Sequence, residues 1–415
     1  MTNQISLSGA SDVRPKLSAL IQDMCPNGVE FKTLGEVCEM KRGSTITANQ
    51  AEDGDIPVIA GGQKPAYFHN QSNREGKNIT VAGSGAYAGY VAYWEQPIFV
   101  SDAFTVTPKE AFLDIKFVYY FLTNIQDKIY HTKKGSGVPH VHPSSIADFE
   151  IPLPPLEIQK KIVECLDKFS ALAAELQAEL QAELQMRRKQ YEYYRTQLLT
   201  PHSDCNSATK SDDCNWEWKT LGELCVSIKD GMHNLPASSL EETDYPIISA
   251  QNIFDNKIDY IAKRYVEKAT YEKENKRTNV EVGDVLLTIV ATIGRSAVVT
   301  DNRPVLLQRS VCVLKPSEKI YPKFLKYSLD TNRVQSYMLA NAHGAAQAGL
   351  YLNQVEQIKI ALPPLKEQKR IADLLEKFDK LITSMEDGIP AEQAAQQKRY
   401  EYYRDLLLTF DRKAV

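Results

Sequence analysis

LPPLEIQKKIVECLDKFSALAAELQAELQAELQMRRKQYEYYRTQLLT, from Leu153 to Thr200, is the stretch that decides the fold, because the chain contains it twice. The second version begins at Leu362 and reads LPPLKEQKRIADLLEKF, followed further on by RYEYYRDLLLT. Leu153 and Leu362 are 209 residues apart, and so are Tyr191 and Tyr400. Two unrelated surface helices would not share these letters at one offset. The sequence therefore predicts the same long element at two places.

Apolar residues in the first version recur every three or four positions, which is typical of one helix face. They are Ile158, Ile162, Leu166, Phe169, Leu172, Leu176, Leu180 and Leu184. Pro154 and Pro155 stand where such a helix begins, and a helix from Leu156 to Leu199 would be about 66 Å long at about 1.5 Å per residue. A helix of that length needs a partner. We expect the second copy to pack against it as an antiparallel coiled coil.

A tetrapeptide repeat, AAEL, QAEL, QAEL, fills Ala173 to Leu184. Its residues are strong helix formers, so it is predicted to act as a stiff spacer whose length depends on the number of repeats. The second copy has SMEDGIPAEQ at the corresponding place. Gly388 and Pro390 are expected to kink or interrupt that helix near residues 388–390, because proline loses a backbone hydrogen bond and clashes with the preceding turn.

The composition indicates a soluble globular protein of two or more domains, with 415 residues, 43% of them hydrophobic and 25% charged. No apolar run approaches the roughly 18 to 20 residues of a spanning helix, and MTNQISLSGASD at the start does not read as a secretion signal. We therefore expect a cytoplasmic protein. Its seven cysteines have no framework spacing and fit reduced thiols. A zinc site at His202, Cys205, Cys214 and Cys225 is disfavoured because they contain no Cys-x-x-Cys pair.

The charge pattern limits how the chain could bind nucleic acid. The formal net charge is −4, which argues against a generally basic surface. Basic and acidic residues are nearly balanced in every segment of the chain. DNA binding would therefore have to use local patches, with further positive charge supplied by a partner.

A second repeat precedes each long helix. FKTLGEVCEMKRG, from Phe31, matches WKTLGELCVSIKDG, from Trp218. KNITVAGSGAYAGYVAY, from Lys77, parallels GDVLLTIVATIGRSAVV, from Gly283, and each reads as two strands joined by a glycine-containing turn. KFVYYFL and KFLKYSL read as short helices. Each long helix is thus predicted to follow a compact, partly β domain of roughly 150 residues.

The predicted fold class is α+β, with two mixed α/β domains in a pseudo-twofold tandem repeat, separated by the two long helices. The predicted boundaries are 1–152 for the first domain, 153–200 for the first long helix, 201–361 for the second domain and 362–415 for the second long helix. The first domain includes an N-terminal lead-in with a short helix from about Arg14 to Met24.

These residues resemble the specificity subunits of type I restriction-modification systems. LPPLEIQKKI and LPPLKEQKRI, the TLGE openings, the QYEYYRTQLL and RYEYYRDLLL ends and the tetrapeptide repeat all match that family's pattern. The resemblance covers the whole chain. It implies two target-recognition domains that each read one half of a split DNA sequence, with helices that set the unspecified spacer and dock two methyltransferase subunits. The Gly388 and Pro390 segment departs from this pattern.

The resemblance also implies that the chemistry belongs to the partners. These would use S-adenosylmethionine, ATP and magnesium, methylate adenine, and recruit ATP-dependent restriction subunits through the methyltransferase. This chain is expected to hold no cofactor and no metal, and not to be an enzyme. An amino-methyltransferase needs an Asn/Asp-Pro-Pro-aromatic motif, and the two Leu-Pro-Pro-Leu motifs share only its prolines. The loop from Gly83 to Gly89 lacks a Walker lysine.

Polar and basic residues recur in the predicted loops of both domains, where Arg, Lys, Asn and Gln can bind base edges in the major groove and Lys and Arg can neutralise phosphates. The candidates in the first domain are Lys41, Arg42, Gln63, Lys64, Tyr67, Ser84, Tyr87, Lys133, Lys134, Ser136 and His140. The candidates in the second domain are Lys229, His233, Asn234, Gln251, Asn252, Arg295, Gln308, Arg309, His343 and Gln347. Any single one is more simply a solvated loop residue, but the set favours DNA reading.

Residues on the repeated helical segments are instead assigned to helix packing or to docking of the methyltransferase. The docking candidates are Pro154, Pro155, Gln159, Tyr191, Tyr194, Pro363, Pro364, Gln368, Tyr400 and Tyr403. The alternative function is a non-catalytic coiled-coil scaffold that binds protein partners rather than DNA, and it accounts less well for the polar loops. The bases of either half-site do not follow from the sequence.

Overall fold

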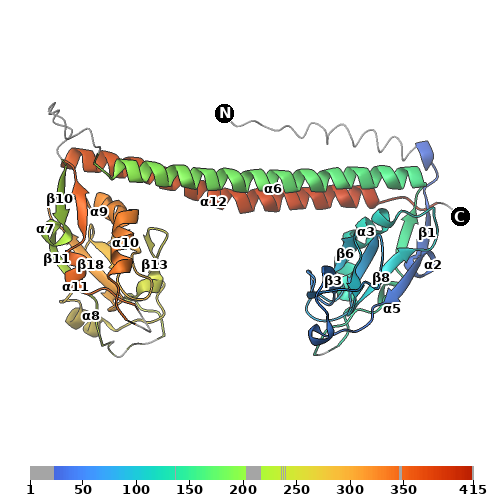
Figure 1. The fold of residues 1–415 in the computed structure, drawn as a ribbon, viewed down its shortest axis with the longest axis horizontal. Coiled ribbons are helices and arrows are strands. Elements are labelled where there is room, and N and C mark those ends of the chain that lie inside the picture. The colour runs from blue at the N-terminus through green and yellow to red at the C-terminus, as the bar shows by residue number, and fades with distance from the viewer. Residues whose placement is uncertain are drawn as a thin grey trace. The chain divides into compact units, whose positions relative to one another are not determined.

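The computed structural model describes residues 23–135, 137–201, 216–234, 236, 238, 240–344 and 348–413. The chain forms two compact units, Met1–Leu180 with Ile389–Val415, and Gln181–Gly388. Each unit holds one α/β domain and part of each long helix, α6 (Leu156–Leu198) and α12 (Leu365–Leu408), as Figure 1 shows. The predicted α+β class with two domains and two long helices is confirmed. The expected lead-in helix lies almost entirely outside the described residues.

The first domain is built around a four-stranded sheet of order β2-β8-β5-β6, in which all neighbours are antiparallel. Arg42 pairs with Phe104, and Ala82 pairs with Ala103, so β2 and β5 end where β8 begins. Helix α3 packs on this sheet (Figure 1). The elements are β1 (Glu30–Thr33), α2 (Leu34–Val37), β2 (Cys38–Arg42), η1 (Ala48–Gln50), β3 (Ile56–Ile59), β4 (Tyr67–His69), β5 (Asn78–Ala82), β6 (Val91–Trp94), β7 (Phe99–Val100), β8 (Ala103–Pro108), α3 (Ile115–Asn124), α4 (Gln126–His131), α5 (Pro143–Ile146) and β9 (Glu150–Leu153).

The second domain repeats this plan with a sheet of order β11-β18-β15-β16. Asp230 pairs with Cys312, and Thr288 with Val311, so β11 and β15 end where β18 begins. The elements are β10 (Glu217–Thr220), α7 (Leu221–Leu224), β11 (Cys225–Asp230), β12 (Ile247–Ile248), η4 (Ala250–Asn252), β13 (Ile253–Phe254), β14 (Lys257–Ile258), α8 (Lys268–Glu274), β15 (Val285–Thr288), β16 (Ser296–Val298), β17 (Leu306–Leu307), β18 (Val311–Pro316), α9 (Pro322–Leu329), α10 (Asn332–Ala340), α11 (Leu352–Glu356) and β19 (Lys359–Leu362).

The repeated TLGE tetrapeptide forms a helix start. Thr33 precedes α2, and the Glu36 carboxylate accepts hydrogen bonds from its backbone N–H (2.7 Å) and its hydroxyl (2.8 Å). Thr220 and Glu223 repeat this arrangement before α7. These bonds satisfy groups that a helix start leaves unpaired, and they lower the pKa of Glu36 and of Glu223. The tetrapeptide recurs for a structural reason.

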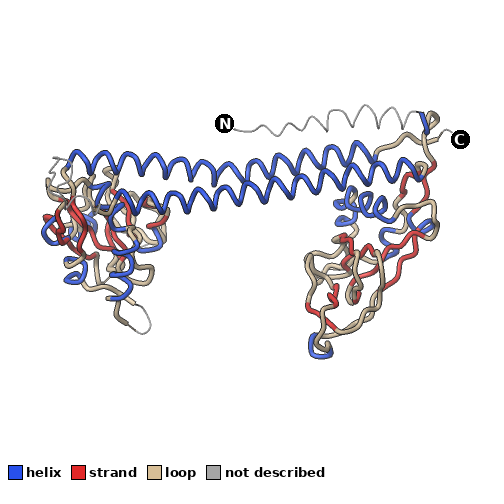
Figure 2. The backbone as a smooth tube through the Cα atoms, turned by 45° about the horizontal axis from the view of Figure 1, so that its top comes forward, coloured by secondary structure: helices blue, strands red, loops and turns tan. Residues whose placement is uncertain are grey.

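The two long helices run side by side in Figures 1 and 2. Within the first unit, Phe169 near the start of α6 contacts Tyr403 near the end of α12. Within the second unit, Tyr194 near the end of α6 contacts Phe378 near the start of α12. These contacts confirm the antiparallel pairing.

One residue of the predicted apolar face lies elsewhere. Leu172 is 50% exposed, whereas Leu176 is half-buried and Leu184 is buried. Ala173 takes the half-buried position next to Leu172. The buried stripe shifts because 3.6 residues complete one helical turn, so contacts spaced by three and four residues must alternate to stay on one face.

The second helix is not interrupted near residues 388–390, and the kink expected there stays a prediction. Helix α12 is continuous from Leu365 to Leu408 with Pro390 inside it. Ile389 is buried, and alanine, glutamate and glutamine follow the proline. Burial of this neighbour and the high helix propensity of the flanking residues compensate for the hydrogen bond that proline cannot donate.

No described helix is long and apolar enough to cross a membrane. Of the four zinc candidates, His202, Cys205 and Cys214 lie outside the described residues. Among the residues that are described, no group of three or more His, Cys, Asp or Glu side chains is arranged to hold a metal ion.

Candidate nucleic-acid interface

The loops of the first domain meet at the end of its sheet where β2 and β5 stop and β8 begins. We call this set, the described parts of residues 42–47, 60–66, 83–90, 101–102 and 132–142, the first loop edge. A side chain at Gly61 would collide with the Ser84 carbonyl, and one at Gly43 with the Val100 carbonyl. The 60–66 loop is therefore packed backbone to backbone against the 83–90 loop, and the 43–47 loop is packed in the same way against the end of β7.

A cation and two imidazoles lie together at the first loop edge. Arg42 is the last residue of β2, and its Nη2 is 2.5 Å from Nδ1 of His142. The rings of His142 and His140 are parallel within 2°, with centroids 6.1 Å apart. His140 in turn exchanges backbone hydrogen bonds with Lys134, 3.0 and 2.8 Å long. This arrangement presents hydrogen-bond donors that can pair with phosphates, and both donors and acceptors that can pair with base edges.

Other predicted residues of the first domain lie around this group. The Ser84 hydroxyl bonds to the exposed Asp102, and Lys133 donates to the Ala86 carbonyl at 3.1 Å. The Tyr67 hydroxyl donates to the Ile46 carbonyl at 2.5 Å, so that group is already used. Exposed loop positions are held by Gln63, Lys64 and Tyr87. Lys41 is on β2, paired with Glu39 at 3.0 Å, and Ser136 lies outside the described residues.

The second domain has an equivalent set of loops where β11 and β15 end, which we call the second loop edge. It comprises the described parts of residues 230–234, 249–252, 289–295, 308–310 and 341–350, together with Arg277, which contacts Asp230. Gly231 packs against the Leu307 carbonyl as Gly43 packs against Val100. His343 exchanges two 2.9 Å backbone bonds with Gly349, in the place of Lys134 and His140. Gly135 and Gly344 have φ values of +114° and +124° in these matching turns, where a side chain would be strained.

Several second-domain candidates are brought together there. The Gln308 backbone donates to Ile248 at 2.8 Å, and the exposed Arg309 donates its backbone N–H to Met232 at 3.0 Å. The exposed Gln251 is in η4, whose Ala250 N–H donates to the Ser310 hydroxyl at 3.1 Å. Five further candidates are exposed, namely Lys229, His233, Asn234, Arg295 and His343. Gln347 lies outside the described residues.

Asn252, one of the predicted DNA-binding residues, has its side chain engaged inside the domain. Its side chain is buried, and its Oδ1 accepts hydrogen bonds from the Ser249 backbone (3.1 Å) and hydroxyl (2.9 Å). Its Nδ2 donates to the carbonyls of Asp259 and Ile261, both at 3.1 Å. The amide is fully used in holding η4 and the following hairpin.

Four residues at these edges were not predicted, namely Asp102 and His142 in the first domain and Asp230 and Arg277 in the second. Asp230 ends β11 and pairs with both Arg277 and His233. Arg277 is 47 positions away from Asp230 in the chain, so no local pattern signals the contact. His142 is two residues from His140 in PHVHP, and the adjacent Pro143 starting α5 is the only local sign of its placement.

Two of the predicted docking residues are structural instead. The Gln159 side chain is 1% exposed and bonds to Asp114 N–H (2.8 Å), Phe112 O (3.0 Å) and Pro154 O (2.8 Å). Gln368 repeats this in the second unit, with bonds to Tyr321 N–H (2.8 Å), Lys319 O (3.0 Å) and Pro363 O (2.8 Å). Each amide ties a long helix to its own domain, and a docking role for these two residues stays a prediction.

The other docking candidates divide by exposure. Pro155 and Pro364 are exposed, while Pro154 and Pro363 are buried. The rings of Tyr194 and Tyr403 stack on phenylalanines of the opposite helix. Tyr191 and Tyr400 are half-buried, and burial raises the pKa of each hydroxyl. These tyrosines hold the helix pair together, and Tyr194 keeps an exposed edge.

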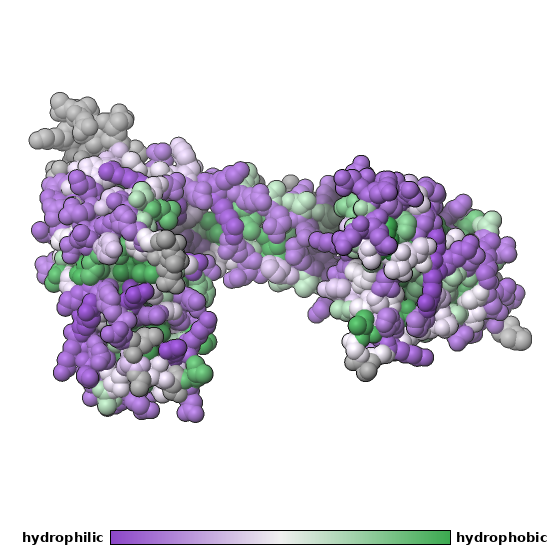
Figure 3. Space-filling model, turned by 60° about the horizontal axis from the view of Figure 1, so that its bottom comes forward, coloured by the Kyte–Doolittle hydropathy of each residue, from purple (hydrophilic) through white to green (hydrophobic). Residues whose placement is uncertain are grey.

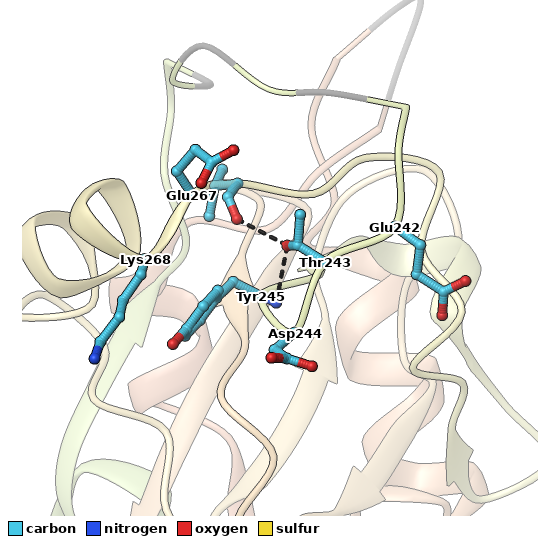
Figure 4. Close-up of a pocket in the computed structure, with 7 residues that line it drawn as sticks. Glu242, Thr243, Asp244, Tyr245, Glu267 and Lys268 are labelled. Carbon is cyan, nitrogen blue, oxygen red and sulfur yellow. Dashed lines mark hydrogen bonds between the residues drawn. The ribbon is translucent and has the colours of Figure 1, made fainter.

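Figure 4 shows a shallow hollow in the second domain that does not suit DNA. It is lined by Glu242, Thr243, Asp244, Tyr245, Val266, Glu267 and Lys268. Thr243 donates its hydroxyl hydrogen to the Val266 carbonyl at 2.8 Å and accepts from Tyr245 N–H at 3.2 Å. Three carboxylates face different directions around it, and their charge repels phosphate.

The surface of both domains in Figure 3 is mostly hydrophilic, with one narrow hydrophobic band across the second domain and small hydrophobic patches elsewhere. On the face shown, neither domain presents a broad apolar area of the kind that protein partners usually cover. Polar, directional contacts are therefore the available means of recognition there.

Both the sequence and the fold of this chain are similar to those of known proteins. The sequence model of a family described as "Type I restriction modification DNA specificity domain" matches residues 26–186 and 214–392. The chain is 30% identical over 397 residues to a putative type I restriction enzyme specificity subunit of Haemophilus influenzae, spanning 92% of this chain and 96% of that one. It is 27% identical over 416 residues to the EcoR124I/EcoR124II specificity subunit of Escherichia coli, spanning 92% and 94%.

Two solved structures share the fold. One, from work on complex assembly and conformational transition of the type I restriction-modification system, has a TM-score of 0.68 at 19% identity and spans 92% of this chain and 98% of that one. The HsdS subunit of Thermoanaerobacter tengcongensis has a TM-score of 0.57 at 19% identity and spans 93% and 97%. Both similarities cover the two domains and the long helices.

Proposed function

Since this chain belongs to the type I restriction-modification DNA specificity family, we propose that it reads a bipartite DNA target, with one half-site bound by each loop edge. The two long helices set the spacer between the half-sites. They also provide two equivalent surfaces for two methyltransferase subunits, through which restriction subunits are recruited.

The observation that carries this proposal is the equivalence of the two loop edges. In each domain the loop edge lies at the equivalent end of that domain's own four-stranded sheet. Each edge contains a glycine whose packing leaves no room for a side chain. The exposed groups on the two edges nevertheless differ, with Arg42 and His142 on the first and Gln251 and Arg309 on the second. Equal scaffolds with different side chains are what a reader of two unequal half-sites requires.

The net charge of −4 makes a partner necessary for tight binding. DNA affinity arises mostly from neutralised phosphates, and this chain offers only local cations for that purpose. The methyltransferase subunits would supply the remaining positive surface. They would also bind S-adenosylmethionine and methylate adenine, and ATP and magnesium would serve the restriction subunits. This chain would contribute recognition and no catalytic group.

The test is a map of methylated bases in DNA from a methylation-free host that expresses this chain with its methyltransferase subunit. A host with the methyltransferase alone is the control. A split motif that appears only with this chain supports the proposal and gives the spacer length directly. If both proteins are soluble and associated but no motif appears, the scaffold function replaces DNA reading.

A further inference from the structure

One carboxylate at the second loop edge holds two side chains that face solvent. The Asp230 side chain is 10% exposed, whereas those of Arg277 and His233 are 50% and 60% exposed. The Asp230 Oδ2 is 2.6 Å from Nε2 of His233. The Arg277 guanidinium donates from Nη2 to Oδ1 of Asp230 and from Nε to the Asp230 carbonyl at 3.0 Å.

These bonds determine which part of the guanidinium is available. Arginine has five N–H donors in a planar fork, and Asp230 takes one on Nε and one on Nη2. The three remaining donors are on Nη1 and on the outer side of Nη2. Two adjacent parallel donors of this kind match O6 and N7 of guanine in the major groove.

The charge balance favours a base over a phosphate as the ligand. Phosphate contacts depend on net positive charge, and the ion pair with Asp230 cancels the positive charge of Arg277. The free N–H donors of the Arg277 guanidinium are still available for a base. His233 is bound to the same carboxylate, so the group is fixed on two sides, and little side-chain entropy is left to lose on binding.

The first domain has a different arrangement at the same point of its sheet. Arg42 ends β2 as Asp230 ends β11, and Gly43 and Gly231 follow them in equivalent packing. In the first domain the last residue of the strand is itself the cation, Arg42. In the second domain the last residue of the strand is a carboxylate, Asp230, which holds the cation Arg277 from a distant loop. The two edges therefore present different groups at one equivalent position.

We propose that Arg277 reads a guanine in the half-site bound by the second domain, and that Asp230 is the positioning residue that aims it. This inference rests on the proposed function. It goes further by assigning one base, one contact and the residue that orients the contact.

The experiment is the methylated-base map with Arg277→Ala, Arg277→Lys and Asp230→Asn in the full chain expressed with its methyltransferase. Arg277→Ala and Arg277→Lys should each relax one G·C position of one half-site, by about 5- to 150-fold in preference, because lysine cannot form the paired contact. Arg42→Ala should alter base preference in the half-site bound by the first domain. The two sets of variants together then show which domain binds which half-site. Lys273→Ala, which removes an exposed charge nearby, is the charge-matched control and should alter no position.

Asp230→Asn should relax the same G·C position as Arg277→Ala and add nothing in the Arg277→Ala background. A purely structural role for Asp230 would instead weaken every position, and that result would overturn its assignment. Unchanged base preference in both Arg277 variants, with a split wild-type motif, would overturn the inference while the proposed function stands. Absence of any wild-type motif would overturn both.

Discussion

The ring of Phe169 stacks on the ring of Tyr403, with centroids 5.4 Å apart and planes within 8°. The same pair recurs in the second unit, where Phe378 stacks on Tyr194 at 6.1 Å and 15°. Each pair joins the start of one long helix to the end of the other. The first domain is therefore completed by the C-terminal end of the chain, and the second by the end of α6.

Because Tyr403 packs within the first unit, Tyr403→Ala should destabilise that unit alone. Loss of the stacked ring should lower the free energy of unfolding of the first unit by about 1–2 kcal/mol, because an aromatic pair contributes beyond its buried area. Native-state hydrogen exchange resolves the units, and faster exchange should be confined to the first one. Tyr402→Ala is the matched control, since that ring is mostly exposed. Equal acceleration in both units would contradict the assignment.

Gln159→Ala and Gln368→Ala should each destabilise their own unit by about 2–4 kcal/mol. Each substitution leaves one buried N–H and two carbonyls without their partner, and an unsatisfied buried group costs about 1–3 kcal/mol. Denaturant unfolding of the single variants measures the loss. Lys160→Ala, next to Gln159 and exposed, is the control and should change stability little. Unchanged stability combined with lost methyltransferase binding would restore the docking role.

The repeat in the sequence was sufficient to predict the fold but not the role of every repeated residue. The 209-residue offset was enough to predict two domains and an antiparallel helix pair, because a repeated apolar pattern requires a repeated fold. The same offset does not separate a structural role from a docking role for Gln159 and Gln368. A glutamine repeated for burial and one repeated for binding look the same until their hydrogen bonds are known.

The loop edges set a different limit. Lys134, His140 and Arg309 could be predicted to lie in exposed loops because polar residues in loops are a local signal. Asp230 and Arg277 were missed because their pairing depends on how a distant loop folds over the strand end. Asn252 was included because a sequence does not distinguish a buried capping amide from an amide exposed for base reading. The interruption expected at Pro390 does not occur, since strong helix formers flank the proline and its neighbour Ile389 is buried.

The thiols of Cys38, which is buried, and of Cys225, which is half-buried, should be unreactive in the folded chain. Burial raises the pKa of Cys38 and of Cys225 to about 12, so neither forms the nucleophilic thiolate near pH 8. Iodoacetamide followed by mass spectrometry should label both only after unfolding. Because the folded pKa is raised, the thiols favour the folded state fully below about pH 9, and this contribution falls as pH rises towards 12. Replacing both by alanine should flatten that part of the pH profile relative to wild type.

Arg309→Ala should relax the half-site read by the second domain and leave the other unchanged. Arg309 is exposed, and its backbone is fixed to Met232, so loss of the side chain leaves the loop in place. One lost bidentate base contact would cost about 1–3 kcal/mol of discrimination. The methylated-base map measures this. Equal loss in both half-sites would indicate misfolding or defective docking.

Asn252→Ala is the contrasting variant at the same edge. It removes a buried amide with four hydrogen bonds, so it should lower stability rather than change base preference. A change in one base position at unchanged stability would return Asn252 to the reading residues.

Deletion of Gln177 to Leu180 tests the spacer. The four residues lie within the continuous α6, so their loss shortens this helix by about 6 Å, which corresponds to one or two base-pair rises of about 3.4 Å. The unspecified spacer should become shorter while both half-sites keep their bases, since neither loop edge is touched. Gln177→Ala keeps the helix length and should leave the spacer unchanged. Altered half-sites at an unchanged spacer would show that the helix serves folding of the domains and not their separation on DNA.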